Sequence, residues 1–129
     1  MSSNQNIVRT FIAAGAITEF AVVSINSDSK VVVTTSGTDV AAVGVAQRAC
    51  STGDAVEVVV FGLTRVICAA SNINAFEATP RLAAAAAGTV AVAGAGDYPN
   101  MFVQANINQT AATGGDQLTV LWSPAGTVI

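Results

Sequence analysis

Residues 43–61 read VGVAQRACSTGDAVEVVVF, and this stretch predicts a β-hairpin. Its turn is formed by residues 51–54, Ser-Thr-Gly-Asp, which are typical turn residues. The second strand, residues 55–61, has valine at alternate positions, which places the valines on one face of the strand. These positions are Val56, Val58 and Val60. Glu57 lies on the opposite face, which we therefore expect to be partly exposed to water.

Short apolar segments separated by turn residues continue on both sides of this hairpin, as they do in β-sandwiches and β-barrels. We expect strands over residues 20–25, 30–35, 43–47, 55–61, 64–69 and 89–93, with turns over residues 26–29 and 36–39. Gly62 is expected to interrupt the chain between two of these strands. The polar, uncharged residues MSSNQN open the chain and predict a flexible or extended arm.

Residues 82–88 fit two interpretations. Thr79-Pro80, five alanines and Gly88 have the cap, first-turn proline and terminal glycine of a short helix. Alternatively, residues 83–87 form a strand, and Gly88 makes the turn into the next one. We favour the strand, because the neighbouring segments are strands.

Residues 45–60 and 107–122 resemble each other at a constant offset of 62 residues. Five aligned pairs are identical: Gln47/Gln109, Ala49/Ala111, Gly53/Gly115, Asp54/Asp116 and Val58/Val120. Gly-Asp turns are common in hairpins, but a match of this length favours a duplicated hairpin. Two related hairpins would then lie at opposite edges of a small barrel or sandwich.

The composition indicates an all-β protein with a thin core. Hydrophobic residues make up 52% of the 129 residues, and most of them are the 25 alanines and 19 valines. Valine and the 13 threonines favour strands, because their branched Cβ atoms pack well on a pleated surface. A chain of this length fits one domain. We therefore expect an N-terminal arm over residues 1–10 and a single β domain over residues 11–129.

Charged residues form only 10% of the chain, compared with about 25% in ordinary soluble domains. Either Ser, Thr, Asn and Gln keep the surface hydrated, or partners cover much of it. We favour partners, because interface cores are depleted in charge. The five Lys and Arg residues are scattered and the net charge is −3, so we predict no binding to nucleic acid.

No segment predicts a membrane span. The longest apolar run, residues 82–96, consists mostly of Ala and Gly and is too short to cross a bilayer. Arg9 followed by the apolar residues 11–17 imitates a signal peptide, but residues 1–6 carry no positive side chain and Glu19 follows soon. We therefore expect a protein that is made in the cytoplasm and is not processed.

The sequence offers no set of residues for catalysis. Histidine is absent, which excludes Ser-His-Asp and Cys-His nucleophiles and the commonest zinc sites. Most carboxylates lie close to predicted turns, where Asp usually bonds to its own backbone. Cys50 and Cys68 lack a CxxC spacing, and we expect free, buried thiols, with a disulfide as the alternative. Trp122 is expected to anchor the core or an interface. We predict no enzymatic activity, no metal and no cofactor.

The order of several motifs resembles the capsid decoration (cement) proteins of tailed phages, of the small trimeric type that stabilises the head. The motifs are the segments VGVA at residues 43–46, GDAVEV at residues 53–58 with Gly62 after it, GTV at residues 88–90 and GGDQLTV at residues 114–120. The resemblance covers about residues 16–120, and its motifs are short.

This resemblance implies a compact β-barrel or β-tulip with an extended N-terminal arm. It implies a homotrimer bound to the outer surface of the major capsid protein, made in the host bacterial cytoplasm and located on the virion. Such a trimer would stabilise the expanded head against the pressure of packed DNA. By analogy, the arm would contact the shell or a neighbouring subunit through Asn4, Gln5, Asn6, Ile7, Val8, Arg9 and Thr10.

Two other functions remain open. One is a structural module of a tail or fibre. The other is a secreted carbohydrate-binding or adhesin β-sandwich, which would need export, a disulfide between Cys50 and Cys68, and surface aromatic residues. Beyond five phenylalanines, the chain offers only Tyr98 and Trp122 for stacking on sugars.

Overall fold

The computed structural model describes residues 6–37, 41–69, 73–74, 81–93, 96–97, 101–103, 110–111 and 115–123. These residues form eleven strands and one short 3-10 turn, so the predicted all-β fold class is confirmed. The elements are β1 (Ile7–Ile12), β2 (Val22–Ile25), β3 (Val31–Val33), β4 (Ala42–Ala46), β5 (Ala55–Ile67), β6 (Ile73–Asn74), β7 (Arg81–Ala84), η1 (Ala86–Gly88), β8 (Val90–Val92), β9 (Met101–Val103), β10 (Thr110–Ala111) and β11 (Gln117–Trp122).

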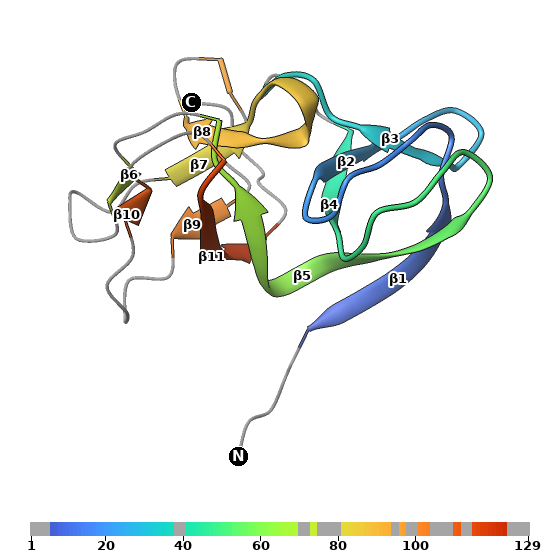
Figure 1. The fold of residues 1–129 in the computed structure, drawn as a ribbon, viewed down its shortest axis with the longest axis horizontal. Helices are drawn as coiled ribbons and strands as arrows, with labels where there is room; N and C mark the ends of the chain where they lie inside the picture. The colour runs from blue at the N-terminus through green and yellow to red at the C-terminus, as the bar shows by residue number, and fades with distance from the viewer. Residues whose placement is uncertain are drawn as a thin grey trace.

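Nine strands belong to one antiparallel sheet. Eight of them follow the order β3-β2-β4-β5-β11-β9-β7-β8, and β1 pairs with β5 outside this path. β6 and β10 form a separate two-stranded sheet. In Figure 1, β1 to β4 occupy one half of the molecule and β7 to β11 the other, and β5 runs through both.

The predicted hairpin of residues 43–61 is confirmed as β4 and β5, which pair antiparallel through Val45 and Val59. Its turn is closed by the Asp54 carboxylate, which accepts a hydrogen bond from the N–H of Ser51 at 2.9 Å. Val56 and Val58 are fully buried. The earlier turn, residues 26–29, is also confirmed, and its Asn26 side chain accepts hydrogen bonds from two backbone N–H groups.

Gly62 does not end the strand, so the predicted interruption is wrong. β5 continues through Gly62, whose φ of 128° lies outside the range that L-residues favour. The partners of β5 change at this residue, however. Residues 55–61 pair with β1 and β4, whereas residues 62–67 pair with β11. Figure 1 shows β5 turning sharply along its course.

The strand interpretation of residues 82–88 is confirmed in its first part. β7 ends at Ala84, and residues 86–88 form a 3-10 turn that leads into β8. Ala87 and Gly88 both have positive φ, at 57° and 74°. This tight reversal lets β7 and β8 pair directly, with Ala84 opposite Val90.

The predicted duplication is confirmed for the second strand of the hairpin and extends far beyond it. The predicted equivalence of residues 45–49 with residues 107–111 is wrong, because Val45 corresponds to Phe102 and residues 110–111 pair with β6. We name β1, β2, β3, β4 and β5 up to Phe61 the first unit, and β5 from Gly62, β7, β8, β9 and β11 the second unit. The two units have the same strand pairing. The pairs Val23/Val33, Ser24/Val32 and Ile25/Val31 between β2 and β3 recur 59 positions later, as Leu82/Val92, Ala83/Ala91 and Ala84/Val90 between β7 and β8.

The pairing of the remaining strands also recurs in the second unit, with slightly different offsets in residue number. In the first unit, Val45 pairs with Val59. In the second unit, Phe102 pairs with Leu121. Phe102 lies 57 positions after Val45, and Leu121 lies 62 positions after Val59. The pairing of β1 with β5 recurs as the pairing of β5 with β11, so that Ile12/Ala55 corresponds to Ile67/Gln117. Each unit therefore contains five strands, and β5 belongs to both units.

Each unit closes in the same way. Ala13 exchanges two 2.8 Å backbone hydrogen bonds with the Gly53-Asp54 turn, and Cys68 does the same with Gly115-Asp116. The next residues, Ala14 and Ala69, donate to Val31 and Val90, both at 2.8 Å. Gly53 and Gly115 also share the same backbone conformation, with φ of 90° and 94°. Each unit thus curls back onto its first strand, as a small barrel does.

The expected location of the related hairpins at opposite edges is wrong. β5 and β11, the second strands of the two copies, are neighbours in the middle of the sheet order. The reason is that β5 doubles as the first strand of the second unit, where it must pair with β11.

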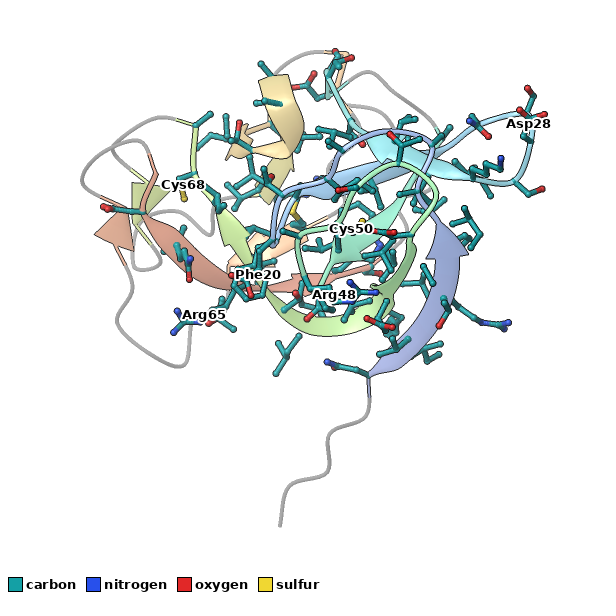
Figure 2. The ribbon with its side chains drawn as sticks, turned by 45° about the vertical axis from the view of Figure 1, so that its right-hand side comes forward. Phe20, Asp28, Arg48, Cys50, Arg65 and Cys68 are labelled. Carbon is teal, nitrogen blue, oxygen red and sulfur yellow. The ribbon has the colours of Figure 1, made fainter. Side chains whose placement is uncertain are left out.

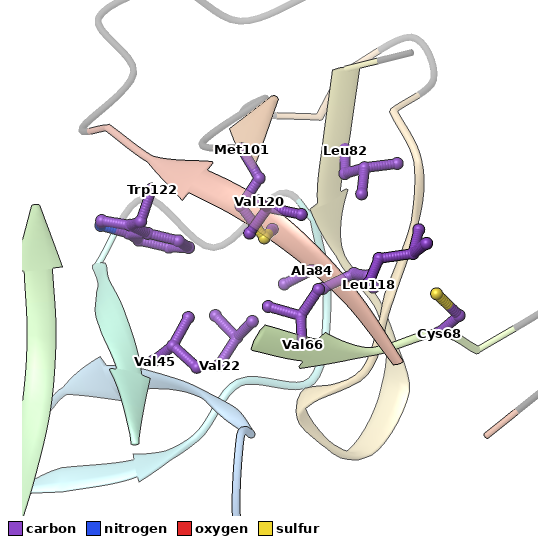
Figure 3. Packing of buried hydrophobic residues seen from close by; sticks show 11 residues of the cluster. Val22, Val45, Val66, Cys68, Leu82, Ala84, Met101, Leu118, Val120 and Trp122 are labelled. Carbon is purple, nitrogen blue, oxygen red and sulfur yellow. The ribbon is translucent and has the colours of Figure 1, made fainter. Parts of the chain in front are cut away.

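The buried residues form two clusters, one for each unit. The first includes Val23, Val31, Val56 and Val58 of the first unit. The second includes Leu82, Val90, Leu118, Val120 and Trp122 of the second unit, and also Val22 and Val45 of the first. Figure 3 shows Val22 and Val45 facing Trp122 from the first unit. Trp122 is 1% exposed, which confirms its predicted role as a core anchor.

Candidate docking surface on strand β1

β1 is an edge strand. Among the described residues, its only strand partner is β5. The N–H and C=O of Ala13 are bonded to the turn on the β5 side. In an antiparallel ladder, alternate residues direct these groups to opposite edges. Val8 and Thr10 therefore direct their N–H and C=O groups away from β5, toward the open edge. At Ile12 this edge is closed by β3, through the bridge between Ala13 and Val31.

Exposed apolar side chains gather on β1 and on the adjacent part of β5. On β1 these are Ile7, Val8 and Ile12, which are 50%, 48% and 41% exposed. On β5 they are Phe61 and Leu63, which are 39% and 44% exposed. Phe61 lies opposite Ile7 in the β1–β5 pair. An edge strand with exposed apolar side chains is a template for pairing with another chain.

Asn6 fixes the start of β1 against the second unit. Its side-chain Nδ2 donates to the carbonyl of Leu63 at 2.8 Å, and its Oδ1 accepts from the N–H of Leu63 at 2.9 Å. The side-chain amide thereby replaces the backbone of a paired residue. Gly62 permits this approach, because a Cβ atom at that position would collide with the Asn6 side chain.

Part of the predicted contact arm thus lies in a strand of the first unit. Asn6 makes the contact with Leu63, and Ile7, Val8, Arg9 and Thr10 belong to β1, where all four are exposed. Asn4 and Gln5 lie outside the described residues. The contacts of this segment with a shell or a neighbouring subunit stay a prediction.

Charges beside this surface are few and partly paired. Arg48 Nε lies 2.9 Å from the carboxylate of Glu57, which is on the strand next to β1. The hydrogen bond with Arg48 lowers the pKa of Glu57, and the same bond raises the pKa of Arg48. Both side chains are about half exposed, so water and salt weaken this pair. The expected partly wet face around Glu57 is therefore confirmed.

The cysteines are free thiols and are not joined in a disulfide, as the sequence favoured. Cys68 is buried, which raises its pKa to about 11. Cys50 is only partly buried, so the expectation of burial holds for one of the two thiols. Figure 2 shows that they lie in different parts of the molecule.

The described part of the chain contains no cluster of three or more side chains that could hold a metal ion. It also contains no helix that is long and apolar enough to span a membrane. Its most distinctive surface is the open edge of β1 with its apolar neighbours, which is suited to binding rather than to chemistry.

No protein-family model matches this chain, and no curated protein matches it in sequence. A solved structure does match: the N base of head fiber gp8.5 of bacteriophage phi29. The two proteins share a fold. The TM-score is 0.67 at 16% sequence identity, and the alignment covers 94% of this chain and 97% of the fiber base. The fold of the fiber base therefore extends over nearly all of this chain.

Sequence reasoning missed two parts of this surface. In the segment IVRTFI, one face of a strand would carry Ile7, Arg9 and Phe11, and the other face Val8, Thr10 and Ile12. Both faces mix polar and apolar residues, so the segment lacks the regular alternation by which a strand is recognised in a sequence. The contact of Asn6 with Leu63 joins residues 57 positions apart, and no local pattern reports such a distance.

Proposed function

We propose that this protein is a structural component of a phage head, which binds the outer capsid surface as a homotrimer and stabilises the expanded head. The observation that carries the proposal is the fold shared with the phi29 head-fiber base over almost the whole of both chains. The proposed partners are the major capsid protein and further copies of this chain, and the proposed location is the virion surface.

The composition and the surface support this proposal. A chain with only 10% charged residues and few charges near β1 can bury surface with a small desolvation penalty. The open edge of β1 can accept a strand from a partner, so that backbone hydrogen bonds give affinity. A trimer engages the shell several times at once, and this avidity compensates for weak single contacts.

Binding to heads provides the test. Purified protein is mixed with expanded heads that lack it, and bound protein is measured after sedimentation of the heads. We expect saturable binding, and we expect decorated heads to release DNA at a higher temperature than bare heads. A Thr10→Pro variant, which removes an outward N–H from β1, should bind more weakly than a Thr35→Ala control in an exposed loop. Failure to bind any phage head would contradict the proposal.

A second candidate is the attachment base of a head fibre. It is favoured by the structural neighbour, which is the N base of a head fiber. Cryo-electron microscopy of heads decorated with the protein separates the two functions. A stabilising protein should occupy equivalent sites over the shell, whereas a fibre base should occupy sites that carry projecting fibres in the complete virion.

A further inference from the structure

A row of apolar side chains lies on the surface where the two units meet. Ile7 of β1 is paired with Phe61 of β5, and Leu63 of β5 is paired with Leu121 of β11, so the members of each pair share a face of the sheet. Phe61 and Leu63 also share a face, because they lie two residues apart on one strand. Ile7, Phe61 and Leu63 are exposed, and Leu121 is partly buried. We name these four residues the junction row.

An arginine lies at each end of the junction row. Arg65 is two residues after Leu63, and Arg9 is two residues after Ile7, so each arginine shares the face of its neighbour. The irregularity between β1 and β5 skips Val60 of β5, and β1 therefore keeps its alternation. Because β1 and β5 are antiparallel, the two arginines extend the row in opposite directions. They are about 20 Å apart along the strands.

The charges of these two arginines are not compensated. Both side chains are exposed, and among the described residues neither is in an ion pair. Arg65 donates a hydrogen bond to the neutral amide of Gln117, Nη1 to Oε1, at 2.9 Å. Figure 2 shows Arg65 at the surface of the second unit. The chain as a whole has a net charge of −3, so this cationic apolar surface does not follow from a basic composition.

The two charges select the kind of partner that the row fits. If two copies packed through their junction rows, each arginine would face an arginine of the other copy, whether the rows ran parallel or antiparallel. Like charges brought together in this way oppose association. Nucleic acid fits no better, because its phosphates would lie against the apolar side chains between the arginines. The row instead matches a segment that is apolar in its centre and acidic at both ends.

We infer that the junction row binds an acidic, amphipathic segment of another protein, whose apolar side chains cover the row and whose carboxylates bind Arg9 and Arg65. Guanidinium groups bind carboxylates through two parallel hydrogen bonds, so the arginines would fix the position of the segment. The assignment of this segment to the major capsid protein rests on the proposed function. In that case the row supplies a contact next to the open edge of β1.

Matched peptides test this chemistry without phage heads. The acidic probe is a peptide of about nine residues, EEVLAVLEE, whose extended length matches the distance between the arginines. The basic probe, KKVLAVLKK, keeps the same apolar centre. Titrations are followed through the amide NMR signals of Phe61 and Leu63. We expect the wild type to bind the acidic probe at least about tenfold more tightly than the basic one.

Charge reversal identifies the residues responsible. Arg9→Glu and Arg65→Glu should each weaken binding of the acidic probe by about tenfold. Lys30→Glu is the matched control, because it reverses an exposed charge beside the turn of residues 26–29, and it should bind as the wild type does. The double variant of Arg9 and Arg65 should prefer the basic probe, a result that a folding defect could not produce. Far-UV circular dichroism verifies that each variant is folded.

Four results would overturn the inference. They are equal affinity of the wild type for both probes, an unchanged preference in the double variant, a loss of binding in Lys30→Glu as large as in Arg9→Glu, and tighter binding to an oligonucleotide or to phosphatidylserine vesicles than to the acidic probe.

Head binding, measured separately on the same proteins, decides the proposed function. A wild type that binds the acidic probe but no phage head would contradict the proposed function and leave the junction row as a peptide site. Heads that bind the wild type and the double variant equally would overturn the assignment of the segment to the capsid protein, while the proposed function would stand. Heads that bind the wild type but not the double variant would support both.

Discussion

The side-chain amide of Asn6 binds both backbone groups of Leu63, so on the edge of β5 that faces away from β11 a side chain rather than a strand pairs with this residue. Each of these hydrogen bonds is worth about 1 kcal/mol of net stability. We expect Asn6→Ala to lower the free energy of unfolding by about 1–2 kcal/mol. Asn6→Asp keeps the acceptor but loses the donor. Hydrogen exchange should therefore show that the Leu63 amide loses protection in Asn6→Ala and keeps part of it in Asn6→Asp. Equal protection in all three proteins would contradict the contact.

Gly62 should be the least replaceable glycine of β5 and its turn. An alanine there would adopt a φ of 128° and also collide with the Asn6 side chain. Gly53 is the matched control, because its φ is 90° but no atom lies near an added Cβ. We expect Gly53→Ala to cost about 1 kcal/mol from backbone strain alone and Gly62→Ala clearly more. Urea denaturation measures both. In the background of Asn6→Ala, the cost of Gly62→Ala should shrink but not vanish, because the collision with the side-chain amide is removed while the Cα of residue 6 still lies 2.9 Å from the added Cβ.

Trp122 should contribute through its volume rather than through its N–H group. It is 1% exposed, and its indole N–H has no hydrogen-bond partner in the described part of the chain. Trp122→Phe removes no hydrogen bond, and we expect it to cost less than about 2 kcal/mol. Trp122→Ala opens a cavity between the two units and should cost about 3–5 kcal/mol. Thermal or urea unfolding measures the loss of stability in both variants. A similar loss in Trp122→Phe and Trp122→Ala would show that Phe cannot fill the site and would contradict the prediction.

The burial of Cys68 predicts a loss of stability in alkaline solution. Its pKa in the folded protein is about 11, above the ordinary thiol value, so folding favours the protonated thiol. This contribution is complete below the unfolded pKa of about 8.5 and is lost as the pH rises to about 11. The wild type should therefore lose stability relative to Cys68→Ala between these pH values. Urea midpoints of the two proteins across this range provide the measurement, and parallel curves would contradict the prediction.

Much of the fold could be predicted from local patterns. The alternating valines of residues 55–61 and the turn residues of the hairpin predicted the pairing of β4 with β5, because both patterns act within a few residues. The shared Gly-Asp turns at Gly53 and Gly115 revealed the duplication, since a positive φ constrains the residue type.

The rest depended on distant contacts. The constant offset of 62 residues holds only for β5 and β11, because the connections of the two units differ in length and change the offset to 59, 57 and 55 elsewhere. Strand positions accept many small apolar residues, so Val23 and Leu82 can be equivalent without being identical. The docking surface was predicted as an arm, because nothing local reports that residues 7–12 find a partner in residues 55–61.

The passage of β5 through both units has a mechanical consequence. A flexible linker would let two repeats swing apart under tension, but here the connection is itself a hydrogen-bonded strand. Its ladder bonds lie across the direction of the strand, so a force along β5 must break many of them at once instead of opening them one by one. Tension between the two units would therefore be carried by a hydrogen-bonded strand rather than by a hinge.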